Sequence, residues 1–341
     1  MKIFISILFV CLFESSLFAK NFVDMLGREV QIPQKTDRVF SASPPMTILL
    51  YALAPQKMIG VNYKFYEEEK LYMIPKVKNL PVLGSFYSAG NQANLEKVVS
   101  LKPDIVFMWD IVRKNGKYFE EALGRFNIPV VYIGQSSIED NIKALHTMGI
   151  FLKEEKRASE LINYAKNNLD RVKKSVSLLK ENEKKSVYFA QGVDGLTSEC
   201  SGNMQSQIIP LVGAKNVFQC DSSFVGSTKK SKITLEKLYT YDPDVIFVSN
   251  KPFFDSLNEK SSWRKLKAFK NNQIYFSPIS PFNWISRPPS LMRFLGVVWM
   301  HNILYPEHFK IKIEDEVKSF YKLFLHLDLN KKEIQNLIRG D

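Results

Sequence analysis

A thirteen-residue motif, called here the repeated phrase, occurs in two similar copies in this chain of 341 residues. LEKVVSLKPDIVF runs from Leu95 to Phe107, and LEKLYTYDPDVIF runs from Leu235 to Phe247. Both copies open with Leu-Glu-Lys, place Pro-Asp before an apolar run, and begin 140 residues apart. That interval exceeds the period of a solenoid repeat and matches the size of a whole domain. The sequence therefore predicts two domains of the same design.

Short apolar runs alternate with helical patterns in both halves of the chain. Such runs, rich in β-branched and aromatic residues, are typical of buried strands. An alternation of strands and helices favours an α/β fold with mainly parallel sheets. We expect two Rossmann-like lobes, the second a diverged copy of the first. The predicted strands are residues 38–42, 59–61, 105–109 and 130–133 in the first half and 186–190, 245–248 and 274–276 in the second.

The segment between the halves has a strong helical pattern. From Glu155 to about Lys180, apolar residues recur every three or four positions, and neither Gly nor Pro interrupts them. A helix of this length spans about 39 Å and would act as a stiff strut between the lobes. We predict an N-terminal lobe over residues 20–154, a linking helix over 155–185 and a C-terminal lobe over 186–341.

The N-terminus has the features of a secretory signal. Lys2 precedes an apolar run that ends near Phe13, and a small-residue cleavage site closes at Ala19. The run is too short for a membrane span, which is the alternative interpretation. A lipoprotein signal with Cys11 as the lipidated residue fits less well, because such signals prefer small residues before the cysteine and bulky residues precede Cys11. We predict a cleaved signal peptide over residues 1–19 and export to the periplasm.

Two cysteines remain after cleavage, Cys200 and Cys220. In an oxidising compartment they could form a disulfide that closes a loop of about 20 residues and stabilises the fold by about 3 kcal/mol. Two buried free thiols are the alternative. The chain has no CxxC pair and no Cys/His cluster, so zinc-knuckle and thioredoxin-type chemistry lack support.

Charge and motif content narrow the possible functions. The net charge is +12, but the lysines are spread over helical stretches without stacking aromatics between them, which argues against nucleic-acid binding. The chain lacks GxSxG, P-loop, GxGxxG and HExxH motifs, so an enzyme is the weaker hypothesis and no cofactor is expected. Its four histidines lie in or beside helical patterns, which disfavours direct binding of a bare metal ion.

The motifs and their order resemble a known family. The opening DxxGRxVxIP at 24–33, the phrase LExxxxxxPDxxF in each half, the linking helix and the export signal are together similar to class III periplasmic substrate-binding proteins of ABC importers. That group captures cobalamin, iron-siderophores and haem. The resemblance implies a monomeric receptor that delivers a small ligand to a permease dimer in the inner membrane, and the ligand we expect is an iron-siderophore.

The resemblance also assigns a role to the repeated phrase. In the family, one acidic residue on each lobe docks onto arginines of the permease, and the matching positions here are Glu96 and Glu236. A two-fold symmetric partner favours such a pair of anchors. The alternative is that both are helix-start residues favoured by the helix dipole, since Asn94 and Thr234 stand where caps would.

The ligand site is expected in the cleft between the lobes, outside the carboxyl ends of the strands. Aromatic and cationic side chains there suit a bulky, anionic ligand. Tyr87 and Trp109 could instead belong to the lobe core, and Arg287 could pair with a local carboxylate. Haem, cobalamin, molybdate and nickel chelates stay open as ligands, and an exported cleft enzyme or a signalling receptor stays open as a function. The candidate contact residues are Pro45, Tyr87, Trp109, Gln191, Lys251, Trp284 and Arg287.

Overall fold

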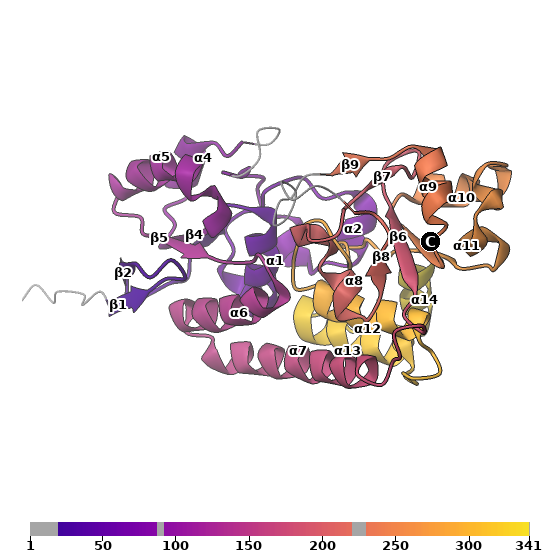
Figure 1. Cartoon of the computed structure of the whole chain (residues 1–341). Helices are drawn as coiled ribbons and strands as arrows, with labels where there is room; N and C mark the ends of the chain where they lie inside the picture. The colour runs from indigo at the N-terminus through magenta and orange to yellow at the C-terminus, as the bar shows by residue number, and fades with distance from the viewer. Residues whose placement is uncertain (1–19, 87–91, 220–229, 341) are drawn as a thin grey trace, which may run out of the picture.

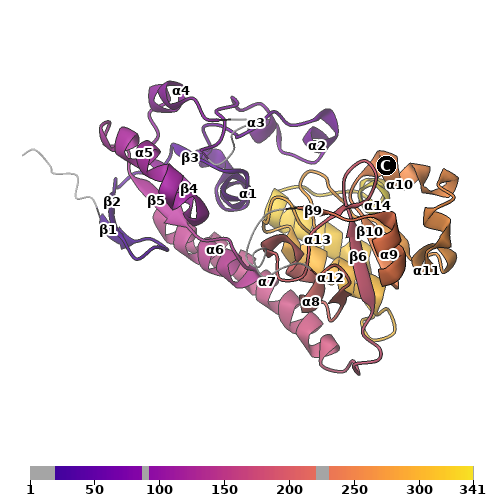
Figure 2. The same cartoon turned by 45° about the horizontal axis from the view of Figure 1, so that its top comes forward.

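Two α/β lobes lie side by side, and one long helix, α7 (Glu155–Val176), runs along both of them (Figures 1 and 2). The computed structural model describes residues 20–86, 92–219 and 230–340. Each lobe is built around a parallel sheet whose strands alternate with helices. The predicted α/β fold of two lobes joined by a long helix is confirmed. The predicted signal peptide lies outside the described residues.

The first lobe contains a three-stranded parallel sheet in the order β3-β4-β5. All residues of the central strand are buried, as expected for a parallel strand covered on both faces. The carboxyl ends of the three strands therefore meet at one edge. The elements are β1 (Lys20–Val23), β2 (Glu29–Ile32), β3 (Val39–Ser41), α1 (Pro44–Leu53), η1 (Pro55–Lys57), α2 (Glu67–Leu71), α3 (Pro75–Lys78), α4 (Leu95–Ser100), β4 (Ile105–Trp109), η3 (Asp110–Val112), α5 (Arg113–Gly124), β5 (Val130–Ile133) and α6 (Ile138–Leu152).

The second lobe contains a four-stranded parallel sheet in the order β11-β10-β6-β8, with the antiparallel pair β7-β9 beside it. The elements are β6 (Ser186–Ala190), β7 (Thr197–Ser198), η4 (Met204–Ser206), α8 (Ile208–Leu211), β8 (Lys215–Asn216), β9 (Ser231–Lys232), α9 (Leu235–Tyr241), β10 (Val245–Val248), α10 (Lys251–Ser256), η6 (Leu257–Glu259), η7 (Trp263–Lys265), α11 (Lys267–Lys270), β11 (Ile274–Phe276), α12 (Arg293–Leu304), α13 (Ile313–Leu325) and α14 (Lys331–Arg339).

The predicted strands are present with one exception. Residues 59–61 form no strand, and Val61 makes only an isolated bridge to Val82. The run is too short to support a ladder, and Gly60 within it lies close against the side chain of Leu83. This prediction was wrong because an apolar triplet does not distinguish a strand from a tightly packed connection.

The repeated phrase folds in the same way in both lobes. Each copy starts a short helix, α4 or α9, on the side of the molecule opposite α7 (Figure 1). The side chains of Asn94 and Thr234 cap these helices by accepting a hydrogen bond from the backbone N–H of the N3 residue. The aspartate of the Pro-Asp step then holds the strand that follows it beside the first strand of the parallel sheet in its lobe. Asp104 accepts from the backbone of Arg38, and Asp244 accepts from the backbone of Ser186.

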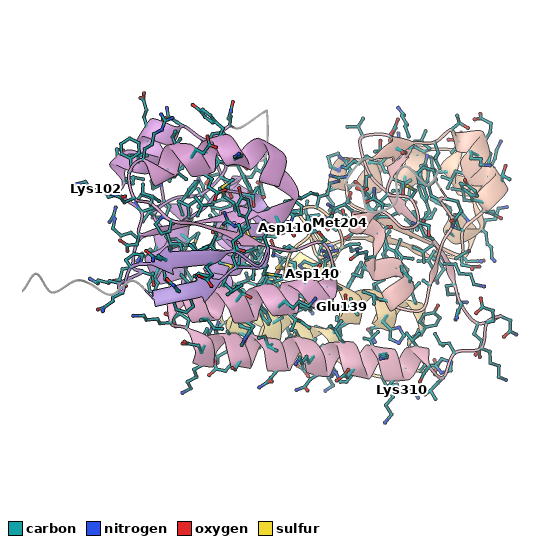
Figure 3. All side chains as sticks on the ribbon, turned by 60° about the vertical axis from the view of Figure 1, so that its left-hand side comes forward. Lys102, Asp110, Glu139, Asp140, Met204 and Lys310 are labelled. Atoms are coloured by element: carbon teal, nitrogen blue, oxygen red, sulfur yellow. The ribbon has the colours of Figure 1, made fainter. Side chains whose placement is uncertain are left out.

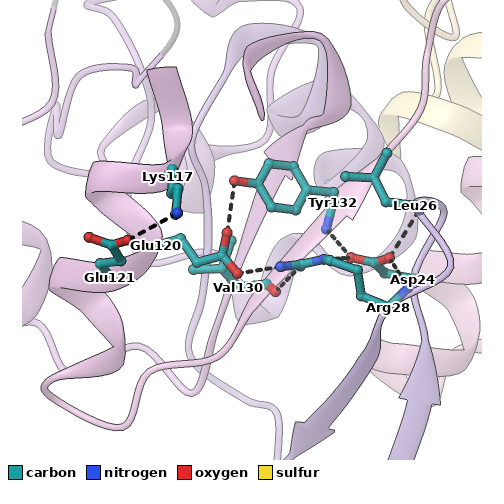
Figure 4. Close-up of polar contacts among 8 residues, drawn as sticks. All are labelled: Asp24, Leu26, Arg28, Lys117, Glu120, Glu121, Val130 and Tyr132. Atoms are coloured by element: carbon teal, nitrogen blue, oxygen red, sulfur yellow. Dashed lines mark hydrogen bonds and ion pairs between the residues drawn. The ribbon is translucent and has the colours of Figure 1, made fainter. Parts of the chain in front are cut away.

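The opening motif fastens the β1-β2 hairpin to the first lobe (Figure 4). Asp24 is buried and accepts hydrogen bonds from the backbone of Leu26 and Tyr132 and from the side chain of Arg28. Arg28 also donates to the carboxylate of Glu120 and lies over the ring of Tyr132 at 4.5 Å. Because every partner belongs to the hairpin or the lobe, the role of this motif is structural.

Helix α7 is shorter than the sequence pattern predicts. It ends at Val176 rather than near Lys180, and a turn in which Glu183 accepts from the backbone of Lys180 leads into β6. The predicted linking helix over 155–185 is corrected accordingly. Its 22 residues still span about 33 Å.

The two lobes share one apolar core. A single cluster of buried residues includes α1 of the first lobe, the inner face of α7, and α12 and α13 of the second lobe. The hydroxyl of Tyr51 on α1 donates to the backbone oxygen of Leu325 at 2.8 Å, and Arg157 on α7 donates to that of Leu323. A shared, close-packed core resists relative movement of the lobes.

Candidate functional site

Two adjoining cavities separate the lobes on one side of the molecule. The first, of about 400 Å³, lies between the segment 63–69 of the first lobe and the segment 279–288 of the second. The second, of about 290 Å³, shares Glu68, Ile279 and Ser280 with it and extends to Lys251 and Tyr72. Arg287 lines the first cavity and Lys251 the second, and contact of either residue with a ligand stays a prediction.

Arg287 on the second-lobe wall belongs to a polar cluster that extends into the lobe behind it. The Arg287 side chain is one-third exposed, and its Nε donates to Oε1 of the fully buried Glu199 at 2.8 Å. Nε2 of Gln191, which follows β6, donates to the same oxygen at 3.4 Å. Loss of hydration and the neighbouring Arg287 lower the pKa of Lys230, while Glu199 acts in the opposite direction. Of these three charged groups Arg287 alone lines the cavity, and its guanidinium is paired with Glu199.

The first-lobe wall is acidic and aromatic. Tyr63, Tyr66, Glu68 and Glu69 line the cavity opposite Arg287. Burial, together with the nearby Glu68, raises the pKa of Glu69, although its carboxylate accepts a hydrogen bond from the backbone of Tyr66. A molecule held between the walls therefore meets carboxylates and phenols on one side and a guanidinium on the other.

Several predicted contact residues lie in the core. Trp284 is fully buried, its indole N–H donates to the hydroxyl of Tyr321 at 3.2 Å, and its ring packs at right angles to Trp299. Trp109 at the end of β4 and Pro45 at the start of α1 are also buried. These positions do not support direct contact with a ligand in the cavities. Tyr87 lies outside the described residues.

Some of the buried polar atoms that lack a partner among the described residues follow the carboxyl ends of parallel strands. Such atoms are costly in a finished core and mark places where water or a ligand is bound. In the first lobe they belong to side chains that follow β3, β4 and β5, and in the second to residues near β7, η4, β11 and the start of α12. Within the described part of the chain these atoms are Ser41 Oγ, Ser43 Oγ, Asp110 Oδ1, Gln135 Oε1, Ser198 Oγ, Glu199 Oε2, Gln205 Oε1, Ser277 Oγ, and Nε and Nη2 of Arg293.

A larger hollow of about 750 Å³ lies on the first lobe alone. It is bounded by the β1-β2 turn, the end of β4, and the facing sides of α6 and α7. Asp110 stands at its inner end, where burial and the nearby Asp140 raise the pKa of its carboxyl group. No residue of the second lobe contributes, so this hollow is not the predicted cleft.

Across residues 20–86, 92–219 and 230–340, no group of three or more His, Cys, Asp and Glu side chains could hold a metal ion. His301 is buried in α12, with its ring nitrogens against Val212 O and Ser175 Oγ. Its ring therefore joins α12 to α7 and to the end of α8.

The remaining predicted residues have distinct positions. Cys200 is buried and disulfide-bonded, and Cys220 lies outside the described residues, so the pairing stays a prediction. Glu96 and Glu236 are both exposed in the first turn of their helices, and the burial pattern around them is the same in both lobes. The two carboxylates are therefore presented on equivalent surfaces.

Comparison with known proteins agrees with this geometry. A family model described as periplasmic binding protein matches residues 41–280, well over half of the chain. The chain is a periplasmic binding protein. A solute-binding protein of an ABC transporter from Sulfurospirillum deleyianum has 31% sequence identity with it and a TM-score of 0.84, over 93% of this chain and 98% of that one. The predicted resemblance is thus confirmed.

Several curated relatives carry ligand names, and two of them name different ligands. This binding protein is 23% identical to the molybdate-binding protein MolA of Haemophilus influenzae, over 94% of this chain and 95% of the relative. It is also 23% identical to the Fe(3+)-citrate-binding protein YfmC of Bacillus subtilis, over 61% of this chain and 64% of the relative.

No helix among the described residues is both long and apolar enough to cross a membrane.

Sequence reasoning missed Glu199 and Arg293. Glu199 stands beside Cys200 in a short polar stretch, and nothing in that stretch points to Arg287, 88 positions away. Arg293 had a usable signal, because it is the one charge in the apolar run LMRFLGVVWM. A lone arginine in a buried helical pattern is costly and so indicates a specific role.

Proposed function

We propose that this protein captures a metal chelate, an iron-siderophore complex, in the cavities between its lobes and delivers it to an ABC permease dimer in the inner membrane. It acts as a monomeric receptor without catalysis, after export through a cleaved signal peptide. The observation that carries the proposal is the pair of adjoining cavities between a wall with Glu68 and Tyr66 and a wall with Arg287.

The size and chemistry of the walls favour an organic chelate over a small inorganic oxyanion. The first cavity alone measures about 400 Å³, within the range of sites for drug-sized ligands. An oxyanion would be repelled by Glu68 and Glu69, whereas a chelate can present hydroxyl or amide donors to them and an anionic face to Arg287. Haem, cobalamin, molybdate and nickel chelates are the alternatives.

A fluorescence panel tests this proposal. The mature protein is titrated with ferric catecholate and hydroxamate chelates, ferric citrate, haem, cyanocobalamin, molybdate and nickel-histidine. Saturable quenching by one ferric chelate, with the chelate recovered unchanged, supports the proposal. Selective binding of molybdate or cobalamin would change the ligand class, and conversion of the chelate would favour an enzyme.

Ligand binding should change the overall shape only slightly. The shared core and the bond between Tyr51 and Leu325 hold the lobes together, so we expect a small closure. Small-angle scattering of the free and bound forms should give nearly equal radii of gyration. A compaction as large as that of a hinge-bending receptor would show that α7 and the shared core do not restrain the lobes.

Replacing Arg287 should affect both binding and folding. We expect Arg287→Ala to weaken ligand affinity by about 1.5–3 kcal/mol through loss of a charged hydrogen bond, and Arg287→Lys to recover only part of it. The Ala variant should also melt at a lower temperature, because the buried Glu199 loses its ion pair. A variant that melts lower but binds as tightly as the wild type would make Arg287 purely structural.

A further inference from the structure

The two cations that line the cavities among the described residues are both paired. Arg287 lies 2.8 Å from the carboxylate of Glu199, behind the first cavity. Lys251 lies 2.6 Å from the carboxylate of Asp255, beside the second. A carboxylate at this distance opposes most of the field that a cation presents to a ligand nearby. The charge that a ligand meets is therefore decided mainly on the opposite wall, which belongs to the first lobe.

Helix α2 supplies the carboxylates of that wall. Its first turn contains Glu67, Glu68 and Glu69. Glu67 lines neither cavity and pairs with Lys70 at 2.7 Å. Glu68 lines both cavities and Glu69 lines the first, and within the described part of the chain neither of them belongs to an ion pair. The cavities therefore face two carboxylates without a counter-charge.

This negative charge comes from one short segment. Figure 3 shows three further acidic residues, Asp110, Glu139 and Asp140, at the junction between the lobes, and none of them lines either cavity. Asp110 and Asp140 border the separate hollow on the first lobe. A change confined to α2 can therefore remove the acidic character of the cavities.

Aromatic rings line the same cavity. Tyr63 and Tyr66 belong to its first-lobe wall, and Phe282 faces them from the second lobe. Tyr63 is mostly buried against Phe65, with 5.2 Å between the ring centroids, and its hydroxyl has no hydrogen-bond partner among the described residues. The ring of Tyr66 is 71% exposed. Ring faces attract organic cations, so rings and carboxylates favour the same kind of group.

Neither the start of the helix nor a metal ion accounts for both carboxylates. Glu69 accepts a hydrogen bond from the backbone N–H of Tyr66 at 2.8 Å and so helps to begin α2. Glu68 makes no hydrogen bond or ion pair within residues 20–86, 92–219 and 230–340. A bare metal ion needs more ligands, and no group of three or more His, Cys, Asp and Glu side chains in the described chain could hold one. An organic cation needs only a carboxylate and a ring face.

We propose that the α2 wall, which consists of Tyr63, Tyr66, Glu68 and Glu69, selects chelates that carry a positively charged organic group, a protonated amine. This inference rests on the proposed function and names the ligand class of the same site. The ammonium group donates charge-assisted hydrogen bonds to the two carboxylates and lies against the face of Tyr66. Chelates whose charge is only negative are disfavoured by the same wall.

Two ferric chelates that differ by one charge are the probes. Ferrioxamine B carries a protonated primary amine outside its iron-binding groups, and N-acetyl-ferrioxamine B carries a neutral amide at the same place. In calorimetric titration the wild type should bind the amine form about 10-fold more tightly, as expected for a charged hydrogen-bonding group. The two chelates have the same iron-binding groups, so the difference reports on the amine alone.

Matched variants locate the effect on α2. Glu68→Gln combined with Glu69→Gln removes both charges, and the amide at position 69 can still accept from the backbone of Tyr66. This double variant should bind ferrioxamine B about 10-fold more weakly and the acetylated chelate as tightly as before. Tyr66→Leu should weaken binding of ferrioxamine B by about 2- to 5-fold. The control Glu67→Gln removes an equal charge that lines neither cavity, and the preference for the amine should persist.

The outcomes separate this inference from the proposed function. If the wild type binds both chelates equally, or if the double variant keeps the preference for the amine, the inference is overturned and the receptor function stands. Failure of every metal chelate removes the support for the proposed function instead.

A further measurement applies if neither ferrioxamine binds. The wild type and the double variant are then melted in choline chloride and in sodium chloride at equal concentration. Stabilisation by choline in the wild type but not in the double variant supports the cation site. Equal responses of the two proteins overturn it.

Discussion

Replacing Glu96 and Glu236 together by alanine should abolish uptake through the permease while leaving ligand affinity and melting temperature nearly unchanged. Both side chains are exposed in the first turn of short helices, where a carboxylate stabilises the fold by only about 0.3–1 kcal/mol. In a two-fold docking contact with permease arginines, the loss of both anchors removes two charge-assisted interactions at once. The measurement is uptake of the ligand into cells that carry the variant.

The control must remove equivalent charges elsewhere. Glu155 and Glu314 are also exposed acidic residues in the first turns of helices, α7 and α13, which do not belong to the repeated phrase. Glu155→Ala with Glu314→Ala should leave uptake intact. Normal uptake by the Glu96/Glu236 double variant would contradict the docking role and would leave these residues only their effect on the start of each helix.

The second large effect is expected at Trp284. Trp284→Ala should destabilise the protein by about 3–5 kcal/mol, because it removes a fully buried indole that packs on Trp299 and bonds Tyr321. The backbone N–H of Trp284 donates to Pro278 O, and the alanine variant keeps this bond, so the effect comes from the lost side-chain contacts. Chemical denaturation of the ligand-free protein measures the effect.

A smaller substitution distinguishes packing from ligand contact. Trp284→Phe keeps much of the apolar volume but leaves the hydroxyl of Tyr321 without the indole donor, so its cost should be smaller than that of alanine. In both variants, ligand affinity should fall only as far as the substitution disorders the cavity-lining segment 278–288. Wild-type stability with lost affinity would place Trp284 in the ligand site, as the sequence had suggested.

Much of the fold could be predicted because local signals and tertiary packing agree. The runs at 105–109, 186–190 and 245–248 are buried strands, since continuous apolar runs of that length suit central positions of parallel sheets. The caps at Asn94 and Thr234 followed from residue type and position alone. Features that depend on a few neighbouring residues, such as these strands and caps, could therefore be predicted from one sequence.

The candidate site was less predictable because its contacts join distant segments. Arg287 was identified as a cleft residue, but its partner Glu199 could not be, since their pairing depends on how β7 and the 278–288 loop are placed. Trp109 and Trp284 were predicted to lie in the cleft, but both side chains are buried in the core. An aromatic residue in either position can face the core or a ligand. The sequence does not record which way such a side chain turns.

The central claim is most directly tested by calorimetric titration of the mature protein with a ferric siderophore, followed by recovery of the ligand. The account predicts saturation at one chelate per chain and release of the same chelate, chemically unchanged, when the protein is unfolded. Absence of saturable binding to every metal chelate tried, or recovery of a modified product, would contradict it.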